Sequence, residues 1–453
     1  MSAANGHTTA TMTFKHGVHP EEFKELSADC AIERMPFVKE YTLPLGQHIG
    51  APSKPIVKKG DKVQRGQKIA NAGGFVSVAL HSPVDGTVKD ITLMPHPNGT
   101  LQQAISIIAD PFSSQLLKLP PVANPEQIDA KTFVSMVQDA GIVGMGGAAF
   151  PAHVKFALPE GKNCKYLMLN GCECEPFLTA DHRIMVEHAE EIIDGIRILN
   201  RFLGAKKTYI AIEANKPDAI TILNDLANKS GLPIEVCPLK VKYPQGAEKM
   251  MITAILGKEV PSGKLPLDLE IVVSNVGTIA SISDLFRKSK PLIERVVTVT
   301  GTAIKRPSNV LVPIGTPMRD VMNLCGGITD ASARILLGGP MMGAVQKDLD
   351  APVLKGTSGI LVLTKNEVSD LDEYNCIRCS RCVDACPIYL NPSLLGMLAK
   401  KGLWDEMAEN NIMDCFECAS CSFVCPSAIP LVQSFRVGKG MLREKWGREK
   451  EKA

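Results

Sequence analysis

The spacing of apolar and polar residues changes along the chain and predicts several structural modules in series. Between residues 42 and about 110, short apolar runs alternate with turn residues, a pattern typical of an all-β module. From about residue 125, segments with helical spacing alternate with strand-like ones, which predicts a parallel sheet covered by helices. A shorter β-rich stretch follows at 291–345, and the mixed charges at 437–453 indicate a solvated helix end.

These changes, with a length of 453 residues, indicate a multidomain α/β protein. The predicted parts are an N-terminal segment with the all-β module (1–124), an α/β domain with a Rossmann-like parallel sheet (125–290), a small domain that looks like a β-grasp of the soluble-ligand-binding kind (291–345), a cysteine-rich module (366–436) and a charged tail (437–453).

The all-β module carries the phrase SPVDGTV at residues 82–88. It resembles the half-repeats of biotinyl and lipoyl carrier domains, which implies a barrel-sandwich hybrid. Carriers need a lysine at the hairpin tip, and none lies between Gly73 and Thr87. We therefore expect this module to have a structural role and not to carry a swinging arm.

The charge balance excludes some partners. The chain has 50 Lys and Arg against 48 Asp and Glu, a formal net charge of +2, and no basic stripe with interleaved aromatic residues. Nucleic acid is therefore not an expected partner. The start, MSAANGHTTATMTF, does not form a signal peptide, and nowhere do about 18 apolar residues follow one another. We expect a cytoplasmic chain that does not itself cross a membrane.

Eight of the 14 cysteines lie between Cys376 and Cys425 and follow one pattern twice. Each copy reads CxxCxxCxxxCP, the ligand spacing of proteins with two [4Fe–4S] clusters. In that spacing, three cysteines of one copy and the fourth cysteine of the other hold each cluster. The predicted ligands are Cys376, Cys379, Cys382 and Cys425 for cluster 1, and Cys415, Cys418, Cys421 and Cys386 for cluster 2.

Other features of the cysteines bear on this interpretation. Zinc knuckles use two pairs of ligands and not four cysteines that end in CP, so a pair of zinc sites is disfavoured. The segment between the two motifs has apolar residues at helical spacing, which favours an α-helical ferredoxin module over the compact β-hairpin type. These residues are Leu394, Leu395, Leu398, Leu403 and Met407. The cysteines without ligand spacing, expected to be small buried hydrophobes, are Cys30, Cys164, Cys237 and Cys325.

A glycine-rich segment at 141–147 follows a predicted helix. Glycines let backbone NH groups approach a phosphate, but they also serve tight turns, so this run alone leaves ligand binding open. Polar residues also follow predicted strands at 170–176 and 243–248, where an open α/β sheet places its ligand. Glu173 and Glu175 fit either a solvated loop or contact with a ribose or nicotinamide. The neighbouring Cys172 and Cys174 fit buried thiols.

The order of these motifs carries a resemblance that covers nearly the whole chain. FKHGVHP at 14–20, the barrel-sandwich module, GMGGAAFPAHVK at 144–155, NGCECEP at 170–176 and the twin cysteine motifs resemble the C subunit of Rnf electron-transport complexes. The resemblance implies a translocase subunit that transfers electrons between NAD(H) and ferredoxin while other subunits move Na+ or H+. It also implies a peripheral position on the cytoplasmic side of the cell membrane, with other Rnf subunits and NADH as partners and ferredoxin as an indirect one.

The middle of the chain is also similar to the flavin- and NADH-binding subunit of respiratory complex I, whose motifs read GRGGAGFP, NADExEP and YxxGEE. By that resemblance residues 125–290 bind FMN and NADH, with FMN on the glycine loop and Lys155. The implied cofactor-binding residues are Gly144, Gly146, Gly147, Lys155, Asn170, Glu173, Glu175, Tyr243, Gly246, Glu248, Asn275 and Thr278. The chain departs from the pattern at Met145, Cys172 and Ala247, which changes the expected ribityl and nucleotide contacts.

The resemblance assigns the chemistry to cofactors and not to a catalytic side chain. A nicotinamide gives two electrons as hydride and an iron–sulfur cluster passes one, so FMN with two [4Fe–4S] clusters would convert between NAD(H) and one-electron carriers. Two alternatives stay open, a flavin-free electron conduit and a related cobalamin reductase, although the latter is not expected to need the module led by GVHP. The membrane subunit of a sodium-pumping quinone reductase shares front-end modules but lacks the twin cysteine motifs.

Overall fold

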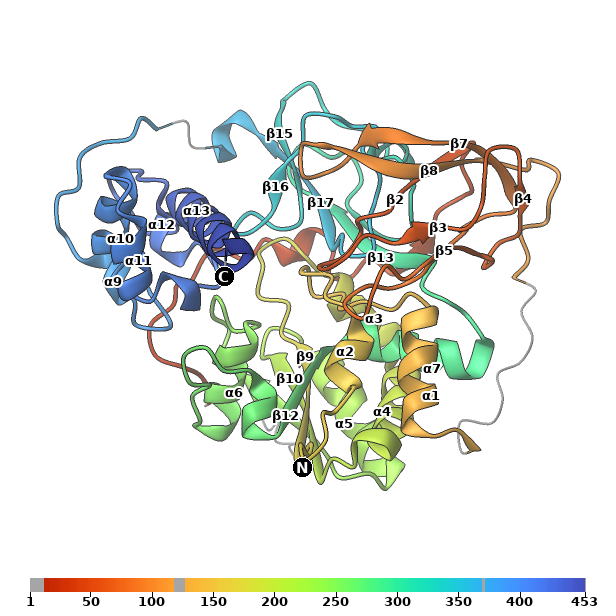
Figure 1. The fold of residues 1–453 in the computed structure, drawn as a ribbon, viewed down its shortest axis with the longest axis horizontal. Helices are drawn as coiled ribbons and strands as arrows, with labels where there is room; N and C mark the ends of the chain where they lie inside the picture. Colours follow the sequence, from red (N-terminus) through yellow and green to blue (C-terminus); the bar gives the residue numbers. More distant parts are fainter. Residues whose placement is uncertain (1–11, 118–126, 369–370, 453) are drawn as a thin grey trace, which may run out of the picture.

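The computed structural model describes residues 12–117, 127–368 and 371–452. Figure 1 shows three groups of elements: an α/β domain in green and yellow below, a mixed sheet and a β module in cyan and orange above, and a blue helical module to one side. The α/β character and the series of modules predicted from the sequence are both present. Among the described residues no helix is long and apolar enough to span a membrane.

The N-terminal β module consists of two small sheets. One has the order β2 (Glu40–Pro44), β8 (Leu101–Ala109), β7 (Gly86–Pro95) and β4 (Lys62–Val63), with all pairs antiparallel. The other has the order β3 (Lys54–Pro55), β5 (Lys68–Asn71) and β6 (Leu80–His81). Leu43, Ile69, Leu80 and Ile105 are fully or almost fully buried between them. The predicted all-β module is confirmed.

The α/β domain has a four-stranded parallel sheet in the order β11, β10, β9, β12. The strands are β9 (Tyr166–Gly171), β10 (Lys207–Glu213), β11 (Ile234–Leu239) and β12 (Ile271–Asn275). The helices are α1 (Ala130–Asp139), α2 (Ala152–Phe156), α3 (Ala180–Glu187), α4 (Ala189–Leu203), α5 (Pro217–Ser230), α6 (Glu248–Leu256) and α7 (Val276–Lys288). The segment 183–204, which has helical spacing, forms parts of two helices, α3 and α4, because His188 at their junction leaves helical geometry with φ −124°.

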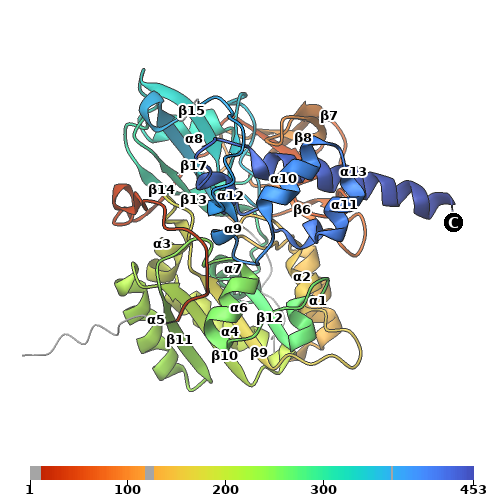
Figure 2. The same cartoon turned by 90° about the vertical axis from the view of Figure 1, so that its left-hand side faces the viewer.

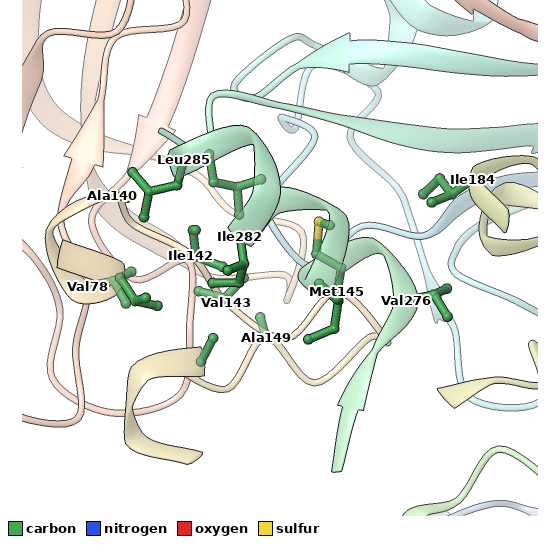
Figure 3. Close-up of a cluster of buried hydrophobic side chains, with 14 of the residues drawn as sticks. Val78, Ala140, Ile142, Val143, Met145, Ala149, Ile184, Val276, Ile282 and Leu285 are labelled. Carbon is green, nitrogen blue, oxygen red and sulfur yellow. The ribbon is translucent and has the colours of Figure 1, made fainter. Parts of the chain in front are cut away.

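Both faces of this sheet are buried, as expected for parallel strands covered by helices. Side chains alternate between the faces along each strand. Leu167 and Leu169 of β9 belong to the large core that α4, α5 and α7 also enter, whereas Met168 packs in a second core with Met251 of α6. Figure 3 shows part of the large core, where Ile142, Val143 and Met145 of the glycine-rich segment lie beside Ile282 of α7.

The upper sheet is built from distant parts of the chain. Its six strands have the order β1 (Ile32–Arg34), β14 (Ser308–Pro313), β13 (Glu294–Thr300), β17 (Gly359–Thr364), β15 (Ser332–Leu337) and β16 (Ala344–Val345), and α8 (Met318–Leu324) packs into its core. The sheet thus extends beyond the predicted range 291–345, because β17 fills the gap between β13 and β15. The first edge strand, β1, comes from the N-terminal segment and pairs parallel with β14.

The blue module is helical, as the apolar spacing predicted. Its helices are α9 (Arg381–Asp384), α10 (Pro392–Lys400), α11 (Trp404–Glu409), α12 (Ser420–Phe423) and α13 (Leu431–Lys452). Short 3-10 helices among the described residues of the whole chain include η1 (Lys24–Leu26), η3 (Pro266–Leu269), η4 (Lys365–Glu367) and η5 (Ile412–Asp414). Leu395, Leu398 and Met407 enter its core, while Leu403 is 36% exposed at the turn between α10 and α11. Figure 2 shows α13 extending away from the rest of the molecule.

The N-terminal segment touches each of the larger parts of the structure. Met12 forms a bridge with Leu239, and Val18 pairs with Tyr243 through reciprocal hydrogen bonds of 2.8 and 2.9 Å. The NH of Gly17 donates to the carbonyl of Ala385 in the helical module at 3.2 Å. In Figure 2 this red segment passes from the edge of the upper sheet down to the α/β domain.

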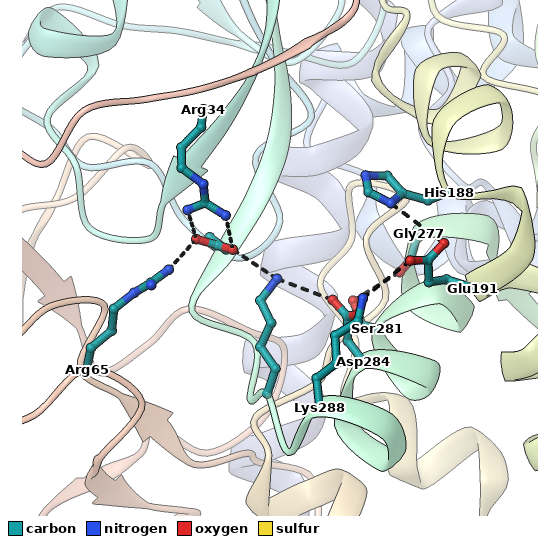
Figure 4. A network of polar contacts seen from close by, with 10 residues as sticks. Arg34, Arg65, His188, Glu191, Gly277, Ser281, Asp284 and Lys288 are labelled. Atoms are coloured by element: carbon teal, nitrogen blue, oxygen red, sulfur yellow. Dashed lines mark hydrogen bonds and ion pairs between the residues drawn. The ribbon is translucent and has the colours of Figure 1, made fainter. Parts of the chain in front are cut away.

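Glu294 at the start of β13 connects three modules through ion pairs. Figure 4 shows two of its partners, Arg34 and Arg65. The Glu294 side chain is 1% exposed and accepts hydrogen bonds from Arg34 at 2.8 and 3.1 Å and from Arg65 of the β module at 2.8 Å. Lys290, just after α7, lies 2.9 Å away. Burial alone would raise the pKa of Glu294, but the hydrogen bond from Arg34 and the charge of Lys290 outweigh it and lower the pKa to about 2.

We expect Glu294→Gln to lower the free energy of unfolding by about 3 kcal/mol, because it removes a buried carboxylate and leaves the mostly buried Arg65 without its partner. Since the folded pKa is depressed from 4.5 to about 2, this contribution is present above pH 4.5 and disappears as the pH falls toward 2. Denaturant unfolding at a series of pH values measures both effects. Asp350→Asn is the control, because its ion pair with Arg319 is exposed and should change stability by less than about 1 kcal/mol. Equal stability of Glu294→Gln and the wild type at pH 7 would contradict the expectation.

Candidate functional site

A cavity of about 320 Å³ lies at the carboxyl ends of the parallel strands, where an open α/β sheet places its ligands. Its volume falls in the range of small-molecule sites. Its lining comes from the α/β domain, the upper sheet and the helical module: Met145, Gly146, Asn170, Glu173, Cys174, Glu175, Leu178, Asp181, Tyr243, Pro244, Gly246, Ala247, Glu248, Lys249, Asn275, Met342, Ser358, Phe416 and Cys418.

A second cavity of about 410 Å³ adjoins the first. The two share Gly146, Glu175, Met342 and Ser358. Its remaining wall comes from Gln47, from residues 147–149 of the glycine loop, and from residues within 337–343 and 354–357 on the side of the upper sheet. The two cavities together form one elongated site beside the glycine loop.

The glycine loop at 144–147 is fixed by hydrogen bonds to the protein on one side, and its residues Gly146 and Gly147 face the cavities on the other. The Thr278 hydroxyl donates to Val143 O at 3.2 Å and accepts from the NH of Met145 at 3.0 Å, so Thr278 supports the loop and does not line the cavity. The NH of Gly144 donates a hydrogen bond to Phe150 O at 2.8 Å, so it too is used within the protein. Gly146 and Gly147 line the cavities, and a Cβ on Gly147 would meet nothing within 4 Å.

A buried lysine fixes the loop at 173–178. Lys24 Nζ donates to the carbonyls of Glu173, Glu175 and Leu178 at 2.9, 2.9 and 2.6 Å. Burial lowers the pKa of Lys24, and the charge of Lys216 lowers it further. No hydrogen bond from the NH groups of Glu173, Cys174 and Glu175 occurs within the part of the chain that the structure describes. This loop therefore offers free donors to the acceptor atoms of a ligand.

The two predicted carboxylates line the cavity but bind protein groups. Glu173, whose φ of 48° is left-handed, accepts from the NH groups of Asp181 and His182 at 2.7 and 3.1 Å and so caps α3. Glu175 accepts from the NH groups of Met341 and Met342 at 3.0 and 2.9 Å and holds the upper sheet against the α/β domain. Burial raises the pKa of Glu175 to about 7.

Asp181 is a cavity residue that the sequence did not reveal. It lines the first cavity in the first turn of α3, and Asn275 Nδ2 donates to it at 2.6 Å. Burial raises its pKa to about 7, and the charge of Glu173 raises it further. No sequence motif contains both Asp181 and Asn275, because the two residues lie 94 positions apart. The available signal was the position of Asp181 in the first turn of a helix just after NGCECEP.

The remaining predicted pocket residues gather at one end of the cavity. Asn170 Nδ2 donates to Gly246 O at 2.7 Å. Tyr243 is 2% exposed, and its hydroxyl has no hydrogen-bond partner among the described residues. Lys155 does not itself line the cavity; its Nζ lies 3.1 Å from Glu248, which does, and donates to Val273 O at 3.2 Å. The free hydroxyl and the free NH groups fit a ligand rich in hydrogen-bonding atoms, as FMN is.

The cysteines of the helical module form two groups, each drawn from both motifs. Cys376, Cys379, Cys382 and Cys425 line one cavity of about 60 Å³. Burial raises the pKa of Cys421, and the nearby thiols of Cys418, Cys415 and Cys386 raise it further. The structure thus brings together the same two sets of four thiols that the crossed spacing predicted, and this donor set fits iron–sulfur clusters.

The backbones of the two motifs correspond position by position. Non-glycine residues take positive φ at the same offsets from the first cysteine of each: Arg378 and Glu417 (56° and 62°), Ser380 and Ala419 (62° and 64°), and Tyr389 and Ala428 (59° and 49°). Left-handed backbone at such residues costs about 1–2 kcal/mol each. Successive residues of this kind form concave rows of NH groups that bind anionic groups, including iron–sulfur clusters.

The second motif reaches the nucleotide-sized cavity directly. Phe416 and Cys418 line it together with Gly146, Glu175 and Gly246. Cys418 also packs in a small core with Val18, Tyr243 and Ala385. Cluster 2 would therefore lie next to the cavity.

The other cysteines match the expectation of buried thiols with two exceptions, since Cys174 is half-buried as well as Cys30. Cys164, Cys172, Cys237 and Cys325 are buried. Burial raises the pKa of Cys172 and of Cys174, so both thiols stay protonated near neutral pH.

Four family models match successive parts of the chain. They are an RnfC barrel sandwich hybrid domain at residues 12–111, a Nuo51 FMN-binding domain at 137–284, an SLBB domain at 296–345 and a 4Fe-4S dicluster domain at 373–429. The matches agree with the order of modules seen in the structure. A solved NAD+-reducing [NiFe]-hydrogenase in its air-oxidised state aligns at 18% identity with a TM-score of 0.48, over 63% of this chain and 55% of that chain.

Several curated proteins are similar over almost the full length. The C subunit of the proton-translocating ferredoxin:NAD(+) oxidoreductase complex of Clostridium ljungdahlii is 46% identical over 441 residues, 97% of this chain and 96% of that protein. The C subunit of the Na(+)-translocating ferredoxin:NAD(+) oxidoreductase complex of Acetobacterium woodii is 44% identical over 94% and 96% of the two chains. The C subunit of the ion-translocating oxidoreductase complex of Rhodobacter capsulatus is 42% identical over 98% and 86%. The chain therefore belongs to the family of C subunits of ion-translocating ferredoxin:NAD(+) oxidoreductase complexes, the Rnf family.

Proposed function

We propose that this chain is the NAD(H)-, FMN- and iron–sulfur-binding subunit of an Rnf-type complex and transfers electrons between NAD(H) and ferredoxin. The observation that carries the proposal is the shared cavity, in which Gly146, Glu175 and Gly246 of the predicted nucleotide site face Phe416 and Cys418 of the second cysteine motif. A ligand in that cavity touches the residues around cluster 2. The flavin-free conduit explains the cysteines but leaves this adjoining cavity without a role.

Each part of the site has a proposed task. Gly146 and Gly147, with Lys155 at the edge, would bind the phosphate of FMN, and Tyr243 and the free NH groups at 173–175 would orient its ring. Bound FMN would supply the change between two-electron exchange with NAD(H) and one-electron exchange with the clusters. The Asp181 carboxyl would gain or lose a proton near neutral pH, since its pKa is raised to about 7. Gly144 and Thr278 support the loop from behind.

The cluster ligands are proposed as predicted, with Cys376, Cys379, Cys382 and Cys425 on cluster 1 and Cys386, Cys415, Cys418 and Cys421 on cluster 2. Cluster 2 would lie nearer to the cavity than cluster 1, because Cys418 lines the cavity and none of the proposed ligands of cluster 1 does. Electrons would thus pass from the cavity to cluster 2 and then to cluster 1, or in reverse.

The partners follow from the relatives, whose names describe complexes that translocate protons or Na+. We propose that other subunits of such a complex hold this chain at the cytoplasmic side of the cell membrane and provide the ion path. We keep the predicted domain boundaries 1–124, 125–290, 366–436 and 437–453. The small β domain predicted at 291–345 would be extended to include the strand at 359–364.

The test is an anaerobic absorbance titration of the purified full chain with NADH, after assays of iron and flavin. We expect about eight irons and one FMN per chain, with the flavin band bleached near one equivalent of NADH. Lys155→Ala should weaken FMN retention about tenfold, equal to about 1.4 kcal/mol, without loss of iron. Lys162→Ala is the matched control, since Lys162 pairs with Asp268 on the surface.

Eight irons with no flavin and no response to NADH would instead support the flavin-free conduit. Bound flavin that NADH does not bleach would contradict the NADH step of the proposal. Reduction of added cobalamin by NADH at a rate comparable to cluster reduction would support the cobalamin reductase.

A further inference from the structure

Arg295 of β13 is a buried cation that forms no ion pair among the residues that the structure describes. Its side chain is 3% exposed and donates to three backbone carbonyls, those of Val296 at 3.2 Å, Lys355 at 2.7 Å and Met145 at 3.4 Å. Burial lowers its pKa to about 10, so the guanidinium stays charged near neutral pH. Burying a charge without a counter-ion is unfavourable, so a nearby anion would stabilise this arrangement.

The negative charges that act on Arg295 come from Asp181 and Glu173, which line the first cavity. Both carboxyls are bound to other groups. Asp181 accepts from Asn275 Nδ2 at 2.6 Å, and Glu173 accepts from two NH groups of α3. Burial also raises the pKa of Asp181 to about 7, so its charge is only partly present near neutral pH. The protein therefore balances the charge of Arg295 incompletely.

The guanidinium fixes two peptide units at once, the one after Met145 and the one after Lys355. Both are trans, and in a trans peptide the C=O and the N–H point in opposite directions. The NH groups of Gly146 and Gly356 therefore point away from Arg295, which lines neither cavity. Both glycines line the second cavity, and neither NH donates a hydrogen bond within the described part of the chain. Both are available to a ligand there.

The second cavity has no cation in its described lining. Glu175 is the only charged residue among those that line it, and burial raises its pKa to about 7. The glycine loop carries no cation either, because Met145 stands where the complex I motif has arginine. The two walls lie close together, since a Cβ on Gly356 would come within 3.2 Å of Gly147 O. Free NH groups from both walls, with a guanidinium behind them, suit a phosphate.

We propose that Arg295 is a positioning residue for a phosphate group bound in the second cavity. It directs the NH groups of Gly146 and Gly356 toward the phosphate and supplies the positive charge behind them. FMN and NAD(H) both carry phosphate, so either nucleotide can supply it. This inference rests on the proposed function and adds to it a contribution of the upper sheet to nucleotide binding.

The test compares ligands with and without the phosphate on the full chain with its clusters. The chain freed of flavin is titrated with FMN and with riboflavin, which lacks only the phosphate. The FMN-loaded chain is titrated by calorimetry with ADP-ribose, which has the pyrophosphate of NAD(H) but no nicotinamide. If FMN supplies the phosphate, Arg295→Gln should weaken FMN binding about tenfold and leave riboflavin binding unchanged. If NAD(H) supplies it, ADP-ribose binding should weaken by a similar factor while FMN binding is unchanged.

Arg295→Lys keeps the charge but cannot hold both carbonyls, so it should lose less affinity than Arg295→Gln. If Arg295→Gln does not fold, this partial loss decides the question. Arg319→Gln is the control, because Arg319 pairs with Asp350 on the surface; it should bind all three ligands like the wild type. Iron content and the midpoint of denaturant unfolding are measured for every variant.

Two results would overturn the proposal. Equal weakening of FMN and riboflavin with unchanged ADP-ribose binding would mean that Arg295 only supports the fold, and Arg295 variants that bind every ligand like the wild type would exclude any role. A different result bears on the proposed function alone: if the wild type prefers FMN to riboflavin and Arg295→Gln loses that preference, but NADH does not bleach the flavin, the NADH step fails and the phosphate site stands.

Discussion

Cys421→Ala is expected to stop electrons from NADH at the flavin, with cluster 1 still present but no longer reduced. Cys421 is buried in the group of four thiols beside the cavity and does not itself line the cavity, so the substitution removes a proposed ligand of cluster 2 and leaves the nucleotide contacts intact. Iron should fall from about eight to about four per chain. NADH should still bleach the flavin band, while the electron paramagnetic resonance signal of a reduced cluster should be missing after NADH addition.

Cys379→Ala is the matched comparison, because it removes a thiol from the exposed group. It should lose a similar amount of iron yet retain a cluster that NADH reduces through the flavin. The order of the two clusters is wrong if the variants exchange these behaviours. The division of work between the cavity and the clusters is wrong if flavin bleaching disappears in both.

Lys24→Met is expected to loosen the nucleotide site although residue 24 does not line it. The substitution leaves three buried carbonyls, those of Glu173, Glu175 and Leu178, without their donor. An unpaired buried polar group costs about 1–3 kcal/mol, so the free energy of unfolding should fall by about 2 kcal/mol or more. Because the same loop carries the free NH groups, FMN affinity should fall at least about tenfold. Denaturant unfolding and titration of the apoprotein with FMN measure the two effects.

Lys15→Met is the control for charge and segment, since Lys15 is exposed on the same N-terminal stretch. It should leave both quantities unchanged. Normal FMN affinity in Lys24→Met, together with lower stability, would mean that the loop keeps its shape without the lysine, and the positioning role would be lost.

Much of the fold could be predicted because its signals are local. Alternation of apolar residues indicated the β module and the parallel strands, and the helical spacing around Leu395, Leu398 and Met407 indicated the helices between the cysteine motifs. The crossed grouping of the thiols could be predicted because the spacing CxxCxxCxxxCP restricts which sulfurs can meet.

The features that could not be predicted depend on contacts between distant residues. Strand β17 lies in the middle of a sheet whose other central strands are far away in the chain, so no local pattern assigns it there. The hydrogen bonds of Lys24, Asp181 and Lys439 join them to residues 22 to 154 positions away in the sequence. Glu173 and Glu175 were recognised as site residues, but their hydrogen bonds to α3 and to the turn at 341–342 depend on how the modules pack.

The N-terminal segment that pairs with Tyr243 and Ala385 has a consequence for biosynthesis. Residues 12–18 leave the ribosome long before their partners, which are translated more than 220 residues later, and His16 meets the carbonyl of Asp384 across 368 residues. Because long-range contacts cannot form before both ends exist, the contacts of this segment with Asp384 and Ala385 of the helical module form only when synthesis is nearly complete. The α/β domain would thus fold on the nascent chain with its cavity open on that side, and cofactor insertion has that interval in which to occur.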